Sequence, residues 1–217
     1  NIEKVNYKFI LNYNSWIKHR NNKNYYPLLS LKEFNDVDLN LVSKKINFLN
    51  IESTELDTVI NIDIPENFVL ILNTSNEHFM PEMRSFFLKT LQIKNPVILS
   101  KNYDMSYSDK FIIHSSTDIG GLFIQGFGDG IFIGNQSNDI KEIKKINNLS
   151  FKILQAARVR VTSTDFISCP SCGRTLFDLQ ETTALIRERT DHLKGLKIGI
   201  MGCIVNGPGE MADADYG

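Results

Sequence analysis

Two short stretches, Asp165-Phe166-Ile167-Ser168-Cys169-Pro170-Ser171-Cys172 and Lys197-Ile198-Gly199-Ile200-Met201-Gly202-Cys203, decide how the C-terminal part of this 217-residue chain folds. Each begins with a short apolar run that is typical of a buried strand, and each ends in cysteine. Between them Thr175-x-x-Asp178 resembles a capping box, residues 176–194 have apolar side chains at helical spacing, and Lys194-Gly195 is typical of a helix end. Arg187 lies late in this expected helix, where we expect it to face solvent or the helix dipole. In an α/β sheet ligands collect at the carboxyl ends of the strands, so we expect all the cysteines at one edge.

These motifs contain every cysteine of the chain, and a carboxylate follows them. Cys169 and Cys172 form a C-x-x-C pair, Cys203 lies 31 residues further on, and a Gly-Pro-Gly turn then leads to Glu210. Three thiolates and one carboxylate could complete four ligands around one metal centre. Thiolates select zinc or iron–sulfur clusters, and an oxygen ligand among them usually marks a position that exchanges. The pattern therefore predicts chemistry at the metal as well as structure.

The spacing alone leaves three interpretations of the cysteines open. Cys-Pro-x-Cys-Gly is a common half of a zinc ribbon, but a ribbon normally needs a second C-x-x-C or a histidine pair. This chain has one further cysteine, and its histidines are scattered along the sequence at His19, His78, His114 and His192. An iron–sulfur centre, a zinc site and uncoordinated thiols all remain possible readings of the spacing.

The composition is that of an ordinary globular protein, with 42% hydrophobic residues and a formal net charge of -1. Such a balance gives no electrostatic footprint for nucleic acid or an anionic membrane, so we expect neither partner. The longest apolar run, Phe68 to Leu72, is too short to span a bilayer. An odd number of cysteines at metal-like spacing argues against a disulfide framework and for a reducing compartment.

The composition changes along the chain. The first 119 residues contain no glycine, whereas 13 glycines follow from Gly120 onward, and 21 of the 22 asparagines precede residue 150. Residues 1–60 are rich in Asn, Lys and Ile, and we treat them as a segment of uncertain order. The first residue is Asn1 and not Met, which leads us to expect that the sequence starts inside a longer protein.

Residues 61–157 alternate between short apolar runs and helical stretches. This alternation predicts an α/β domain with mainly parallel strands. We expect a domain junction at about residues 150–163, with residues 158–217 as a separate domain. The expected strands are Phe68–Leu72, Pro96–Leu99, Phe111–His114 and Gly130–Ile133, and the expected helices are Pro81–Leu91, Asp118–Gln125 and Asp139–Ala157.

Two long motifs, SCPSCGRTLFDLQ at residues 168–180 and IMGCIVNGPGEMADAD at residues 200–215, carry a family resemblance. They resemble the C-terminal domain of 4-hydroxy-3-methylbut-2-enyl diphosphate synthases, the iron–sulfur enzymes of the non-mevalonate isoprenoid pathway. A weaker similarity in TDIGGLFIQGFGDGIFI and NLSFKILQAARVR extends to the three-domain form of plants, apicomplexan parasites and some bacteria. That form has an extra α/β domain between its barrel and its cluster domain.

The resemblance implies a fold and a set of ligands. The implied fold is α/β, an insert-type domain followed by a sulfite/nitrite-reductase-like iron–sulfur domain that is truncated at its C-terminus. A [4Fe-4S] cluster would be held by Cys169, Cys172 and Cys203, with Glu210 as the fourth and labile ligand. Glu210 and Asn206 would be the catalytic residues, since Asn206 matches a family position that contacts substrate; a plain turn residue is its alternative reading.

The resemblance also implies a reaction and partners. The family reductively opens the ring of 2-C-methyl-D-erythritol 2,4-cyclodiphosphate, with electrons from a ferredoxin or a flavodoxin. Its diphosphate substrate is held largely by a barrel domain that these 217 residues lack, and the enzyme is a homodimer. The Asn and Lys bias points to an apicomplexan plastid (apicoplast), with a bacterial cytoplasm as the alternative. The rival functions are a zinc-stabilised, non-catalytic interaction module and an electron-transfer module.

Overall fold

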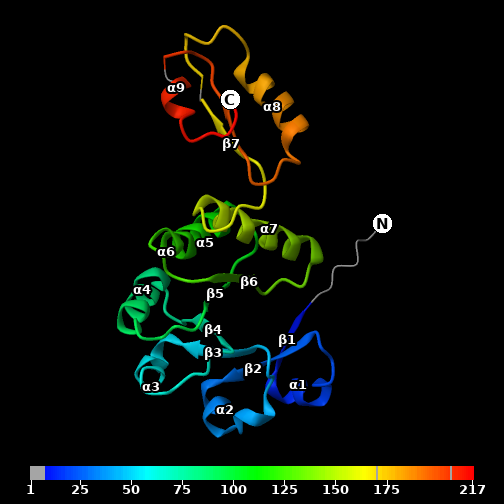
Figure 1. The fold of residues 1–217 in the computed structure, drawn as a ribbon, viewed down its shortest axis with the longest axis vertical. Helices are drawn as coiled ribbons and strands as arrows, with labels where there is room; N and C mark the ends of the chain where they lie inside the picture. Colours follow the sequence, from blue (N-terminus) through cyan, green and yellow to red (C-terminus); the bar gives the residue numbers. More distant parts are fainter. Residues whose placement is uncertain (1–7, 170, 206) are drawn as a thin grey trace. The chain divides into compact units, whose positions relative to one another are not determined.

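The computed structural model describes residues 8–169, 171–205 and 207–217. The chain divides into two compact units, Asn1–Ile153 and Leu154–Gly217, which are described separately below. Both units contain α and β structure, as the sequence predicts (Figure 1).

The first unit is built on a parallel six-stranded sheet whose strands are neighbours in chain order (Figure 1). All five strand pairs are parallel, which confirms the predicted mode of pairing. Parallel neighbours need crossover connections, and helices supply most of them here. The strands are β1 (Phe9–Asn12), β2 (Tyr25–Ser30), β3 (Asn47–Glu52), β4 (Phe68–Asn73), β5 (Val97–Tyr103) and β6 (Gly130–Asn135).

The two faces of this sheet differ in burial. Successive side chains of a strand point to opposite faces, and in β3 and β4 buried and half-buried residues alternate strictly. Leu49, Leu70 and Leu99 share one face and are at most 1% exposed. This face holds the core of the unit.

Helices make up most of the remainder of the first unit. Among the described residues, no helix is long and apolar enough to cross a membrane. The α-helices are α1 (Tyr13–His19), α2 (Leu31–Asp36), α3 (Leu56–Val59), α4 (Phe79–Lys89), α5 (Asp109–Ser115), α6 (Gly121–Ile124) and α7 (Ile140–Ala156), which runs on into the second unit; η1 (Leu39–Leu41) and η2 (Ser53–Glu55) are 3-10 helices, and η3 (Ser116–Gly120) is a π-helix.

Residues 1–60, which the sequence left as a segment of uncertain order, contain three strands in their described part, residues 8–60. Its last strand, β3, pairs along its whole length with β4, so these residues share a sheet with those that follow. The helix α2 begins with a capping box in which Ser30 and Glu33 satisfy each other's backbone N–H groups. A local contact between polar side chains thus starts a helix within this Asn-rich segment.

The predicted strand Phe111–His114 is wrong, because these residues form the middle of helix α5. The Ser108 hydroxyl accepts a hydrogen bond from the Phe111 backbone N–H, and this cap starts the helix. Phe111 is fully buried whereas Ile113 is 62% exposed. A run of four apolar residues is too short to tell a strand from a helix that packs on one side.

An ion pair joins β5 to the π-helix η3. The Lys101 ammonium lies 2.9 Å from an Asp118 carboxylate oxygen, and the Tyr103 hydroxyl donates a hydrogen bond to the same oxygen at 2.9 Å. The ammonium also lies 4.9 Å from the ring centre of Phe79. Burial raises the pKa of Tyr103 well above its usual range, and Asp118 raises it further, so the tyrosine stays a neutral donor.

Replacement of Asp118 by Asn should destabilise the first unit by about 3 kcal/mol, because it leaves the mostly buried Lys101 charge without its partner. Urea denaturation followed by the fluorescence of Trp16, the only tryptophan, would measure this. The matched control is Asp36→Asn, at an exposed carboxylate, which should change stability by less than about 0.5 kcal/mol. Equal effects of the two substitutions would contradict a stabilising role of the ion pair.

The second unit is a small α/β structure. Strands β7 (Asp165–Ser168) and β8 (Lys197–Ile200) form a parallel pair, and helix α8 (Leu179–Thr190) connects them. Leu179, Ile198 and Ile200 form its buried core. The short helix α9 (Gly207–Glu210) follows β8. Both strands were predicted, whereas α8 begins later than the Thr175 cap proposed from the sequence: its N-cap is Asp178, which accepts from the Glu181 N–H at 2.9 Å.

Candidate metal centre

Cys169 follows β7 directly and is fixed by the neighbouring strand. Its backbone N–H donates to the Ile200 carbonyl at 3.1 Å, which continues the ladder by one residue beyond the paired Ser168. Its side chain is half-buried and packs against the unit's core. Cys203 lies only three residues after Ile200, so the parallel pairing brings both cysteine-bearing segments to the same edge, as expected.

Cys172 lies in a turn that is closed by a hydrogen bond from the Thr175 N–H to the Cys172 carbonyl at 3.0 Å. Ser171 within the C-x-x-C segment has a φ of 72°, a left-handed conformation that is uncommon outside glycine. Cys172 itself is exposed. All three cysteines carry thiols that are in no disulfide bond. The thiols are therefore available to act as ligands.

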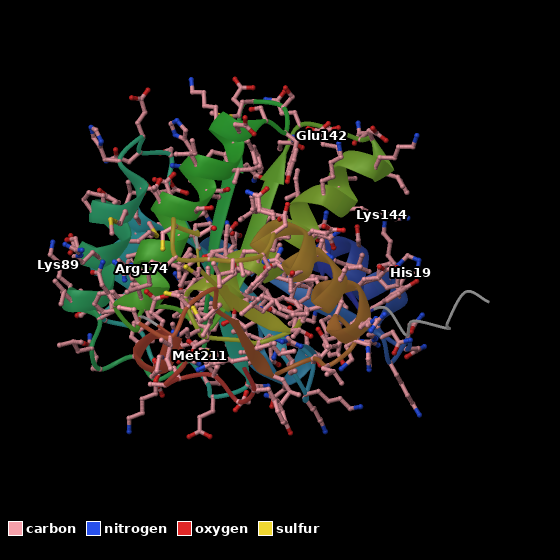
Figure 2. The ribbon with its side chains drawn as sticks, turned by 90° about the horizontal axis from the view of Figure 1, so that it is seen from above. His19, Lys89, Glu142, Lys144, Arg174 and Met211 are labelled. Atoms are coloured by element: carbon pink, nitrogen blue, oxygen red, sulfur yellow. The ribbon has the colours of Figure 1, made fainter. Side chains whose placement is uncertain are left out.

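Glu210 lies in helix α9, and the start of this helix is hydrogen-bonded to Cys203. The Gly207 N–H donates to the Cys203 carbonyl at 3.2 Å, and Glu210 is the last residue of this single turn. Met211 follows Glu210 (Figure 2) and packs on β8: a Cβ added at Gly199 would lie 2.8 Å from its Cγ. The turn that carries the Glu210 carboxylate is therefore held by a hydrogen bond at its start and by the packing of Met211 just after its end. Asn206, the other predicted catalytic residue, lies outside the described residues.

Thr175 and Gly202 connect the two cysteine motifs. A Cβ added at Gly202 would overlap the Thr175 hydroxyl and would lie 2.8 Å from its Cγ2, so the threonine side chain lies against the glycine backbone. Gly202 precedes Cys203, and Thr175 closes the Cys172 turn. The contact therefore brings the Cys172 and Cys203 segments together.

The described residues include no group of three or more His, Cys, Asp or Glu side chains that could hold a single metal ion. A structural zinc site requires all its ligands at about 2.0–2.3 Å from one ion. In a cluster of four irons each ligand binds a different iron atom, so the ligands lie further apart. Three thiols and a carboxylate are donor types that fit the expected iron–sulfur cluster, and thiols also suit zinc.

A cavity of about 390 Å³ borders Cys169. Arg187 of α8 lines it, and the guanidinium carbon lies 5.0 Å from the ring centre of Phe166 in β7. From the sequence we expected Arg187 to face solvent or the helix dipole. A position late in a helix does not indicate that the side chain packs against a residue of a neighbouring strand. The structure adds this cation to the surroundings of the cysteines.

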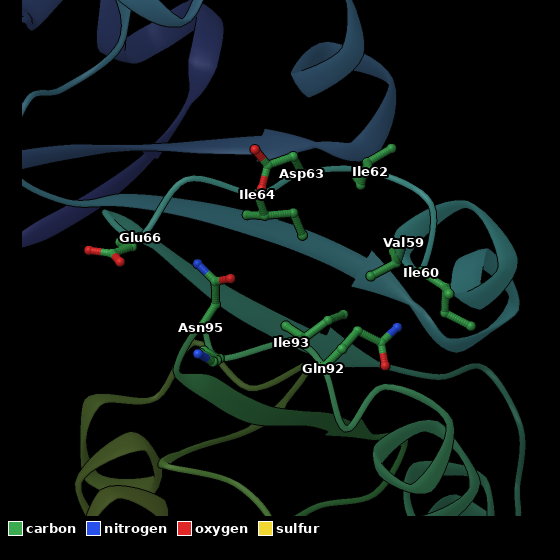
Figure 3. A pocket seen from close by; sticks show the side chains of 10 residues that line it. Val59, Ile60, Ile62, Asp63, Ile64, Glu66, Gln92, Ile93 and Asn95 are labelled. Carbon is green, nitrogen blue, oxygen red and sulfur yellow. The ribbon is translucent and has the colours of Figure 1, made fainter.

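A larger cavity, of about 480 Å³, lies in the first unit, away from every predicted ligand (Figure 3). The segments that precede β4 and β5 form its walls, so it lies at the amino-terminal ends of these strands. Val59, Ile62 and Ile93 give it a largely apolar lining, with Asp63 and Lys94 among the polar residues. None of the predicted site residues lines it.

The cysteine motifs on two parallel strands define a known domain: residues 165–217 match the family described as GcpE protein C-terminal domain. Alignments with individual relatives cover more of this chain. A 4-hydroxy-3-methylbut-2-en-1-yl diphosphate synthase (flavodoxin) of Phocaeicola vulgatus is 37% identical over 214 residues, which are 98% of this chain and 34% of that protein. A 4-hydroxy-3-methylbut-2-en-1-yl diphosphate synthase (ferredoxin), chloroplastic, of Arabidopsis thaliana is 51% identical over 132 residues, 60% of this chain and 17% of that protein.

A further relative with the flavodoxin name, from Leptospira interrogans, is 57% identical over 122 residues, 56% of this chain and 18% of that protein. Residues 165–217 therefore carry this family's C-terminal domain, and nearly the whole chain is similar to 4-hydroxy-3-methylbut-2-en-1-yl diphosphate synthases, as its motifs predict. The chain spans about a third of the length of the relatives that it matches almost throughout.

Replacement of Gly202 by Ala should destabilise the second unit by about 1 to 3 kcal/mol, because the new methyl group would overlap the Thr175 side chain. Hydrogen exchange at the Cys169 amide, which is bonded to β8, would report this loss locally.

Gly173→Ala is the matched control, since a Cβ there meets no atom within 4 Å. It should leave exchange at Cys169 nearly unchanged. If both substitutions accelerated exchange equally, the contact between Thr175 and Gly202 would not be what holds the two motifs together.

Proposed function

We propose that this chain carries the iron–sulfur centre of a 4-hydroxy-3-methylbut-2-enyl diphosphate synthase. Cys169, Cys172 and Cys203 would bind a [4Fe-4S] cluster as thiolates, and Glu210 would be the fourth ligand. The observation that carries the proposal is the meeting of the two cysteine motifs at one edge of β7 and β8, through the Cys169–Ile200 hydrogen bond and the Thr175–Gly202 contact. Residues 158–217 would form the cluster domain, related to sulfite and nitrite reductases, and the preceding α/β structure would be the insert-type domain.

The proposed reaction is the two-electron reductive ring opening of 2-C-methyl-D-erythritol 2,4-cyclodiphosphate. The cluster, when bound, would supply electrons one at a time to the substrate. Glu210 has the weakest hold among the four ligands, because a hard oxygen donor suits soft iron–sulfur centres less well than thiolate does. Glu210 is exposed within its short turn, so its side chain has room to move aside for a substrate oxygen. Asn206 would orient the substrate beside it.

The electron donor would be a ferredoxin or a flavodoxin, since the relatives' names give one or the other. Arg187, exposed beside the Cys169 cavity, is a cation that could contact such a donor or an anionic substrate group. Most ligands of the two phosphates would come from the family's barrel domain, in a homodimer. A plastid is the proposed location, in line with one chloroplastic relative; the bacterial relatives make a bacterial cytoplasm the alternative.

Anaerobic reconstitution with iron and sulfide tests the ligand set. Cys203→Ser should lose most of the bound iron and its visible absorbance, because a thiolate ligand has gone. Glu210→Ala should keep most of both, because three thiolates remain.

Asp213→Ala, which removes an exposed carboxylate three residues beyond Glu210, is the control and should match the wild-type chain in iron and absorbance. Added cyanide should perturb the spectrum of Glu210→Ala more than that of this control, since one iron would be open. Full iron binding by Cys203→Ser, or the uptake of zinc but not iron by the wild-type chain, would refute the proposed ligand set.

The isolated 217-residue chain with its cluster should bind the cyclic diphosphate very weakly and should not open the ring. A diphosphate needs several Arg, Lys or N–H donors facing one cavity, and the cavity beside Cys169 has one such cation, Arg187, in its described lining. Isothermal titration calorimetry and product analysis would check both expectations. Tight binding by this chain would mean that the phosphate site belongs to this part of the enzyme and not to the barrel.

A further inference from the structure

Among the residues that the structure describes, one buried side-chain polar atom has no hydrogen-bond partner, and that atom is Oγ1 of Thr175. A buried hydroxyl without a partner has lost its hydrogen bonds to water and gained none in return. Native proteins contain few such groups, and each one calls for a specific explanation.

Three other buried hydroxyls of this chain donate to backbone carbonyl groups. Thr90 donates to the Phe86 carbonyl at 2.8 Å, and Ser115 donates to the Phe111 carbonyl at 2.8 Å. Thr164, which is 5% exposed, donates to the Thr190 carbonyl at 3.0 Å. The exception at Thr175 is therefore a property of its position and not of the chain in general.

The position of Thr175 is between the proposed ligands. Its N–H is bonded to the Cys172 carbonyl, and its side chain lies against Gly202, the residue before Cys203. The contact with Gly202 restricts the rotation of the side chain, so the hydroxyl is held in place rather than free to turn toward solvent. A fixed, buried hydroxyl donor between two cysteine-bearing segments is suited to an acceptor that arrives with the cofactor.

We propose that the Thr175 hydroxyl donates a hydrogen bond to a sulfur atom of the bound cluster or of a ligating cysteine, and thereby raises the reduction potential of the centre. The proposal rests on the proposed function, because the acceptor is present only when the cluster is. A donor beside the sulfur stabilises the extra negative charge of the reduced state more than it stabilises the oxidised state. Thr175 is thus a positioning and tuning residue, not a ligand.

The test compares the reconstituted wild-type chain with Thr175→Val and Thr175→Ser by redox titration of the visible and electron paramagnetic resonance spectra. Thr175→Val keeps the branched shape and removes the donor, so its potential should fall. The expected change is about tenfold in the reduction equilibrium constant, which is about 59 mV for one electron. Thr175→Ser keeps the hydroxyl and should stay close to the wild-type potential.

Two further measurements separate tuning from packing. Thr182→Val removes a hydroxyl that donates to the Asp178 carbonyl at 2.7 Å in helix α8, and it should leave the potential unchanged. Transfer to heavy water should shift the iron–sulfur vibrational bands of the wild-type chain, by exchange of the hydroxyl proton, and should shift those of Thr175→Val less. If Thr175→Val does not fold, the comparison of Thr175→Ala with Thr175→Ser isolates the hydroxyl in the same way.

An unchanged potential in the cluster-loaded Thr175→Val chain, with unchanged vibrational bands, would overturn this inference while leaving the proposed function intact. A wild-type chain that takes up no iron and sulfide would instead overturn the proposed function, and the role of Thr175 with it. A fall of potential in Thr175→Ser with no fall in Thr175→Val would show that the methyl packing, and not the hydroxyl, sets the potential.

Discussion

The parallel pairing of β7 with β8 is the constraint on which the candidate site depends. It places the ends of the two strands side by side, so that the segments after Ser168 and Ile200 leave the same edge. The hydrogen bond from Cys169 to Ile200 extends this alignment into the first motif. Thr175 and Gly202 then hold the remaining parts of the motifs together, and only a glycine at position 202 allows that approach. The two segments that carry the cysteines thereby start from the same edge, because two short strands share a direction.

The first unit is also built on parallel strand pairing, in a larger sheet. Its six strands are all parallel and follow one another in chain order, so each crossover leads to the next position in the sheet. One face of the sheet carries a fully buried row that includes Leu49, Leu70 and Leu99. The chemistry that could be recognised in the sequence nevertheless lies in the small second unit. In the first unit the mostly buried Lys101–Asp118 ion pair joins β5 to η3.

The elements that sequence reasoning found are those with a strong local signal. The strands at residues 68–72, 130–133, 165–168 and 197–201 are apolar runs bounded by polar or glycine residues, and all are present within a residue or two. The prediction of a strand at Phe111–His114 was wrong because a run of four apolar residues fits either a strand or one buried side of a helix. The cap at Ser108 favours the helix. Strands β1–β3 were missed because asparagine and lysine dilute their apolar pattern. Each is stabilised by pairing with its neighbours in the sheet, and β3 pairs with the predicted strand β4.

The candidate site shows the same division. Cysteine and glutamate can be recognised by residue type and spacing, so the sequence suggests a ligand set, which stays a prediction. Thr175 and Arg187 could not, because a threonine after C-x-x-C and an arginine late in a helix are ordinary residues until a structure shows what surrounds them. Thr175 even had a different prediction, as a helix cap, and the structure gives that role to Asp178. A single sequence does not reveal the role of a side chain when that role depends on its surroundings in the fold and not on its residue type.

The central claim is that three thiolates and one carboxylate hold a four-iron cluster. Mössbauer spectroscopy of the 217-residue chain, reconstituted with isotopically enriched iron, tests it most directly because it resolves iron atoms with different ligands. The account predicts one iron whose signal differs from the other three, and it predicts that Glu210→Ala changes the signal of that iron alone. Four equivalent irons, or a centre that holds zinc in preference to iron, would contradict it.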